Sequence, residues 1–102
     1  MRFYENIISD IDIKDLKVLL NKNYGIAGYY ALCVSGTGRN LMEIISISNM
    51  LKSVNQYKNY GIIAVFKHKS DAMSKAAELI QKYIDEKGSI EGFKEYYNSR
   101  CK

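Results

Sequence analysis

With 102 residues, the chain has the length of one ordinary domain, and two independent cores would each have too little apolar surface to bury. A hydrophobic content of 47% with nine tyrosines is too apolar for a disordered chain. No apolar run approaches the roughly 18 residues of a membrane span, and two cysteines cannot form the disulfide framework of a small secreted domain. We therefore expect one domain over residues 1–102, located in the cytoplasm, with reduced thiols.

The net charge of +4 is concentrated in the middle of the chain. Residues 21–69 carry six Lys or Arg against one acidic residue, Glu43, whereas residues 1–20 carry three against four and residues 70–102 carry six against six. A localised basic zone is typical of proteins that bind the phosphate backbone of nucleic acids. A solvated, lysine-rich face is the alternative explanation of the same charges.

The opening segment predicts one or two helices that end near Asn23. Phe3, Ile7 and Ile11 recur at helical spacing. Asp12 is a residue type that caps helices well, and the apolar spacing resumes after it.

The next segment contains the pattern that decides the fold. Residues 26–35 are apolar and fit a short buried helix or a buried strand equally well, and two glycines then indicate a turn over 35–38. Residues 41–45 predict a short helix, 46–48 supply a break and a hydroxyl N-cap, and 49–57 predict a second helix. This second helix has one apolar face and a polar face whose side chains can all form hydrogen bonds.

The last third of the chain has clearer periodicity. Residues 62–66 are apolar and partly β-branched, which predicts a strand. A stripe of apolar residues predicts a long helix over about 70–87, which Gly88 ends. Ile90, Phe93 and either Tyr96 or Tyr97 indicate a last short helix, whose tyrosines would cover the core or a partner subunit.

A helix, a short break, a helix with a polar outer face, a glycine and a strand follow one another in the order of a winged helix-turn-helix. The first interpretation is therefore a mainly α fold with a small β element. In that motif the second helix enters the major groove of double-stranded DNA, where hydrogen-bonding side chains contact base edges. The candidate DNA-binding residues are Ser48, Asn49, Lys52, Ser53, Asn55, Gln56, Arg39, Lys58, Lys67, His68 and Lys69.

A resemblance to known proteins is carried by Ile47–Tyr57 and by Asn59–Ile63. These residues resemble the recognition helix and following strand of winged-helix replication and partition regulators, and within that group the TubR-type centromere-binding proteins of plasmids and phages. The resemblance covers residues 27–68. It implies a homodimer that binds repeated DNA sites, represses its own operon and recruits a tubulin-like filament GTPase. The chain departs from the pattern at Ser46, where glycine is common, and in lacking a visible second wing strand.

A second interpretation takes residues 29–35 and 41–47 as a β-hairpin that joins the 62–66 strand in an α+β sandwich with an antiparallel sheet. Under this interpretation, Tyr29–Leu32 and Phe66–Ala72 resemble the hybrid-binding domain at the front of some ribonucleases H. That resemblance implies a module that binds RNA or RNA/DNA hybrids. A small phage-type inhibitor that acts by protein–protein contact is a third alternative, favoured by size and aromatic content.

The sequence predicts no catalytic, metal or cofactor site, and we do not expect an enzyme. Gly36 and Gly38 lack the residues that complete a Walker or dinucleotide-binding loop. His68 is the single histidine, and its spacing from Cys33 and Cys101 does not match a zinc site. Cys33 lies in an apolar run, where a buried structural thiol is the ordinary occupant.

Overall fold

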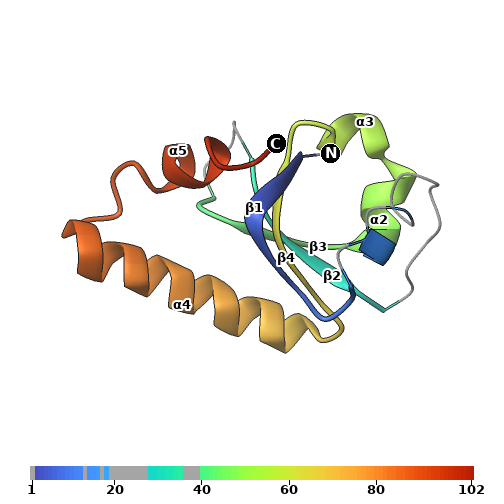
Figure 1. The fold of residues 1–102 in the computed structure, drawn as a ribbon, viewed down its shortest axis with the longest axis horizontal. Helices are drawn as coiled ribbons and strands as arrows, with labels where there is room; N and C mark the ends of the chain where they lie inside the picture. Colours follow the sequence, from blue (N-terminus) through green and yellow to red (C-terminus); the bar gives the residue numbers. More distant parts are fainter. Residues whose placement is uncertain (1, 13, 17, 19–27, 36–39) are drawn as a thin grey trace.

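The structure is a computed structural model that describes residues 2–12, 14–16, 18, 28–35 and 40–102. A four-stranded mixed sheet forms its centre, in the order β1-β4-β2-β3, with helices against both faces (Figure 1). The elements are β1 (Arg2–Ser9), β2 (Tyr30–Val34), β3 (Glu43–Ser46), α2 (Ile47–Lys52), α3 (Val54–Tyr57), β4 (Gly61–Phe66), α4 (Lys69–Lys87) and α5 (Phe93–Asn98). Residues 14–16 and 18 are also helical. The fold class is α+β, as the second interpretation predicts, and not the mainly α fold of the first. The sheet is mixed and not antiparallel throughout, because β1 pairs parallel to β4.

The two central strands are β2 and β4. They pair antiparallel to each other, β3 pairs antiparallel to β2, and β1 pairs parallel to β4. Every residue of β4 is buried, because helices cover both faces of the sheet. Strands that are buried on both faces are near-continuous apolar runs, which explains the composition of the 61–66 segment.

Each face of the sheet has its own apolar core. On one face, Leu16 and the α2 residues Ile47 and Met50 pack against inward-facing residues of β2 and β4. On the other face, α4 and α5 cover the strand side chains that point away from the first core. The buried residues of this second face are Leu32, Val34, Ile63, Ala64, Phe66, Ala72, Tyr83, Phe93, Tyr97 and Cys101.

The predicted helix at the start of the chain is wrong, because residues 2–9 form β1. Phe3 and Ile7 pack on one face of the sheet, and Tyr4 and Ile8 on the other. A spacing of four residues places side chains on one face of a strand as well as of a helix, so the apolar spacing could not separate the two. Asp12 does act as a cap, since its Oδ1 accepts a hydrogen bond from the Lys14 amide at 2.9 Å. The remainder of this predicted helical region up to Asn23 lies largely outside the described residues.

The predicted helix over 41–45 is also wrong. Residues 43–46 form β3, whose Ile45 and Ile44 pair with Ala31 and Leu32 of β2. The pairing buries most of β2 and half-buries β3, and these four backbone pairs outweigh the weak helical preference of five residues. The hairpin of the second interpretation is confirmed, and a winged helix is not.

Three other predicted elements are confirmed, with boundaries that differ from the predicted ones by a few residues at most. The 62–66 strand is β4, the long helix is α4, and the last short helix is α5. Gly88 ends α4 in the left-handed conformation, with φ of 82°. The helix predicted over 49–57 begins earlier, at Ile47, and is interrupted at Ser53, where φ is −133° and ψ is 50°.

In the part of the chain that the structure describes, no helix combines the length and the apolar character that crossing a lipid bilayer requires.

Candidate nucleic-acid interface

The sheet register brings the start of α2 and the start of α4 to the same end of the sheet. Tyr30 of β2 pairs with Ser46 on one side and with Phe66 on the other. Neighbouring strands are about 4.8 Å apart, so the backbones of Ser46 and Phe66 are separated by roughly 10 Å. The segments that follow these two residues therefore leave the same end of the sheet, α2 toward one face and α4 toward the other, although about twenty residues separate them in the sequence.

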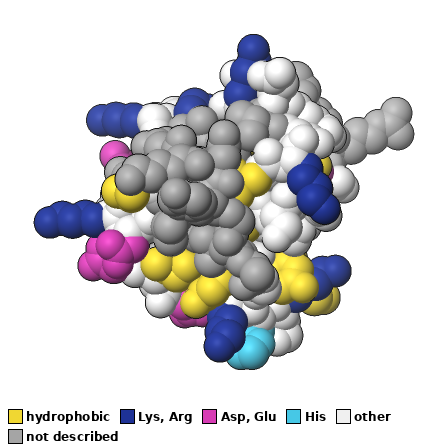
Figure 2. Space-filling view, turned by 90° about the vertical axis from the view of Figure 1, so that its right-hand side faces the viewer, with side chains coloured by type: hydrophobic (Ala, Val, Ile, Leu, Met, Phe, Trp, Pro, Cys, Tyr) yellow, Lys and Arg dark blue, Asp and Glu magenta, His cyan; other side chains and the backbone are white. Residues whose placement is uncertain are grey.

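We call this region the strand-end surface, and define it by Ser48, Asn49, Lys67, His68 and Lys69. Asn49, Lys67, His68 and Lys69 are exposed, and Ser48 is half-buried. In Figure 2 the histidine, drawn in cyan, lies beside a dark-blue cationic side chain at the lower edge of the molecule. The surface thus combines hydrogen-bonding and cationic groups.

The basic part of this surface is a short corner between β4 and α4. The His68 backbone is extended, with φ of −113° and ψ of 131°, and its carbonyl oxygen accepts hydrogen bonds from the amides of Asp71 and Ala72. The Lys67 amide donates a hydrogen bond to Oδ2 of Asp10 at 3.0 Å. The corner lies at the N-terminal end of a 19-residue helix, where the helix dipole adds partial positive charge.

The polar part of the surface is held in place by the first turn of α2. Ser46 is the N-cap, and its Oγ accepts a hydrogen bond from the Asn49 amide at 3.2 Å. The Ile47 amide donates to the Tyr29 carbonyl oxygen at 3.0 Å. Ile47 and Met50 are fully buried, which leaves the intervening Asn49 directed to solvent.

The other predicted DNA-binding residues lie outside this surface, although Lys52 follows Asn49 by three residues, about one turn of α2. Lys52, Asn55, Gln56 and Lys58 are exposed and Ser53 is half-buried. They follow α2 and α3 toward the opposite end of the sheet, where β4 begins. The six residues of β4 span about 20 Å, so Lys58 is well separated from the basic corner.

Arg39, the remaining predicted DNA-binding residue, lies outside the described residues. Asp10 is a part of the interface that sequence reasoning missed, because only the parallel pairing of β1 with β4 brings it next to Lys67. No local pattern around Asp10 indicates that contact.

The two thiols are packed into the core and form no site at the surface. Cys33 and Cys101 are free and buried. Burial raises the pKa of both thiols, so both are protonated at neutral pH. Among the described residues, no three His, Cys, Asp or Glu side chains are placed to hold a metal ion.

Comparison with known proteins adds no assignment to this geometry: no family model, no curated protein and no solved structure matches the chain.

Proposed function

We propose that the protein binds double-stranded nucleic acid containing RNA, either an RNA duplex or an RNA/DNA hybrid, through the strand-end surface. The observation that carries the proposal is the exposure of Lys67, His68 and Lys69 at the positive end of α4, beside the polar start of α2. Such a corner is suited to phosphate oxygens, which supply most of the affinity of nucleic-acid complexes.

The order of elements supports an RNA-containing duplex over a winged-helix complex with DNA. Residues 30–87 contain the two paired strands, two short helices, a strand and a long helix, which agrees with the interpretation under which the resemblance to the hybrid-binding domain is drawn. The winged-helix interpretation needs a bracing helix over 41–45, where this chain has β3.

The chemistry of the surface suits the A-form minor groove. That groove is wide and shallow and displays 2′-hydroxyl groups between two phosphate backbones. Ser48 and Asn49 carry hydroxyl and amide groups that can bond to 2′-hydroxyls. Lys67 and Lys69, at the same end of the sheet, carry the positive charge that phosphates at the edge of the groove attract. Recognition of this kind depends on duplex shape more than on base sequence.

Binding at graded salt concentration tests the proposal. We expect a blunt hybrid or RNA duplex of about 16 base pairs, the span of a known double-stranded-RNA module, to bind more tightly than DNA of the same sequence. The affinity should fall log-linearly with salt. The variant Lys67→Gln/Lys69→Gln should bind more weakly and show a shallower salt slope, reduced by up to about 1.8 for two phosphate contacts.

The matched control is Lys87→Gln/Lys102→Gln, which removes the same charge elsewhere. Lys87 is at the far end of α4, about 28 Å along the helix, and Lys102 is beside Phe3 at the opposite end of the sheet. This control should retain the wild-type slope. Equal loss of affinity in both double variants would mean that net charge alone drives binding, and would contradict the assignment of the surface.

A sequence-specific DNA-binding regulator is the second candidate. The exposure of Asn49, Lys52, Asn55 and Gln56 favours it, because these side chains can reach base edges from α2 and α3. A homodimer and a tubulin-like filament GTPase as partners belong to this candidate and stay predictions. Tighter binding to repeats upstream of the protein's own gene than to any RNA-containing duplex would select it.

A further inference from the structure

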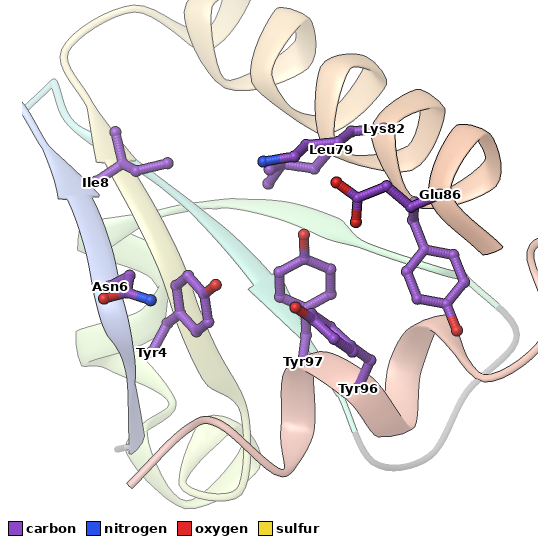
Figure 3. A pocket seen from close by; sticks show the side chains of 9 residues that line it. Tyr4, Asn6, Ile8, Leu79, Lys82, Glu86, Tyr96 and Tyr97 are labelled. Atoms are coloured by element: carbon purple, nitrogen blue, oxygen red, sulfur yellow. The ribbon is translucent and has the colours of Figure 1, made fainter.

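A groove with aromatic walls lies at the outer side of the sheet, between β1, α4 and α5 (Figure 3). Its volume is about 280 Å³, and Tyr4, Tyr96 and Tyr97 form its walls. Lys82 and Glu86 of α4 line the same groove. Lys82 follows Lys69 by thirteen residues, or about 20 Å of helix, so the groove is separate from the strand-end surface.

The tyrosine rings form a rigid set of edge-to-face contacts. The Tyr4 and Tyr97 ring centroids are 5.5 Å apart at 60°, and those of Tyr96 and Tyr97 are 5.1 Å apart at 74°. Arg100 covers one side of Tyr96, with its guanidinium carbon 3.7 Å from the ring centroid. Walls of this kind accept a flat, aromatic body, which makes the same stacking and edge contacts as the rings themselves.

The Tyr97 hydroxyl contributes a neutral donor to this groove. Burial, together with Tyr4, Tyr96 and Glu86 nearby, raises the pKa of Tyr97 to about 12. The phenol therefore stays protonated at neutral pH and can donate a hydrogen bond to an acceptor on a bound molecule.

Lys82 and Glu86 add one positive and one negative group on the same side of α4. They are one helical turn apart and both are exposed, and Figure 3 shows the Glu86 carboxylate near Tyr97 and the Lys82 side chain beside Leu79. Lys75 and Glu78 form a salt bridge on the same helix, and none joins Lys82 or Glu86 to another described residue. The charges balance, which favours a neutral ligand that offers an acceptor to Lys82 and donors to Glu86.

We propose that this groove binds a guanine base, stacked among Tyr4, Tyr96 and Tyr97 and held at its edge by Lys82 and Glu86. Guanine carries O6 and N7 acceptors, which Lys contacts, next to the N1–H and N2–H₂ donors that a carboxylate accepts. Adenine presents a donor and an acceptor in reversed positions and cannot satisfy both side chains. The ligand is a free guanine nucleoside or an unpaired guanosine in RNA.

Equilibrium dialysis of the full chain against radiolabelled guanosine tests the inference. We expect saturable binding that unlabelled guanosine displaces and adenosine at the same concentration does not. Glu86→Gln should weaken binding at least tenfold, since hydrogen bonds to charged groups are the strong ones. Asp85→Asn is the matched control, because Asp85 is the neighbouring carboxylate, bonded to Gln81 and outside the groove lining. It should leave binding unchanged.

A second arm distinguishes the source of the base. A short RNA duplex with one unpaired 3′ guanosine is compared with the same duplex carrying adenosine, using the wild type and Glu86→Gln. A guanosine preference that Glu86→Gln removes, without binding of free guanosine, identifies unpaired RNA as the source. Binding of free guanosine without that preference identifies the free nucleoside.

Absence of guanosine selectivity in both arms, or selectivity that survives in Glu86→Gln, overturns the inference. The inference stands apart from the proposed duplex binding: Lys67→Gln/Lys69→Gln should leave the binding of free guanosine unchanged, so failure of one proposal can be told from failure of the other.

Discussion

The backbone amide of Lys67 donates a hydrogen bond to the Asp10 carboxylate, with 3.0 Å between the nitrogen and Oδ2. The Asp10 amide in turn donates to the Val65 carbonyl oxygen, also at 3.0 Å. This reciprocal contact fixes the basic corner to the end of β1. It also places a negative charge near the two lysines, Lys67 and Lys69, that we propose to contact phosphates. Asp10 therefore holds the corner in place and at the same time weakens its attraction for phosphate.

Substitution of Asp10 separates these two effects. Asp10→Asn keeps an oxygen that can accept from the Lys67 amide and removes the charge, so we expect severalfold tighter duplex binding with little change in the free energy of unfolding. Asp10→Ala also removes the acceptor and should destabilise the fold by about 1 kcal/mol. Chemical denaturation and duplex titration of both variants provide the measurements. Weaker binding by Asp10→Asn would mean that the charge assists the interface.

A second prediction compares two serines, each of which precedes a short helix. Ser46 caps α2 with its side chain, whereas Ser53 precedes α3 with no side-chain capping bond. Ser46→Ala should therefore lower the free energy of unfolding by about 1 kcal/mol, and Ser53→Ala by less than about 0.5 kcal/mol. Equal effects in urea denaturation would show that the Ser46 cap does not anchor the first turn of α2.

The buried phenol of Tyr97 makes stability depend on pH in alkaline solution. Its pKa is raised from 10.0 to about 12 in the folded chain, so at intermediate pH the folded chain retains a proton that the unfolded chain has lost. Stability from this group is complete below pH 10 and is lost as the pH rises toward 12, at up to about 1.4 kcal/mol per pH unit. The unfolding free energies of the wild type and of Tyr97→Phe are measured below and above pH 10. The difference between their slopes against pH is the contribution of the Tyr97 phenol. Identical slopes would contradict the predicted titration.

Local patterns in the sequence predicted the elements that carry their own signals. The apolar stripe and Gly88 define α4, and the β-branched run of residues 62–66 defines most of β4. The two glycines at 36 and 38 indicated a possible hairpin, and its strands, 30–34 and 43–46, flank them in the structure. In each case the signal lies within about twenty residues.

Long-range pairing decided the parts that the sequence could not predict. The spacing of Phe3 and Ile7 fits a strand and a helix equally, and only parallel pairing with β4 makes this segment β1. The strand-end surface depends on Tyr30 lying between Ser46 and Phe66, which no single segment encodes. The groove likewise joins Tyr4 and Tyr97 from opposite ends of the chain.

Amide chemical-shift mapping of the ¹⁵N-labelled chain, titrated with a blunt RNA/DNA hybrid, tests the central claim most directly. If the strand-end surface binds the hybrid, the largest shifts fall on Ser48 and Asn49 and on residues 67–69, and Lys87 and Lys102 do not shift. Shifts confined to α3 and Lys58, or spread evenly over all exposed lysines, would contradict it.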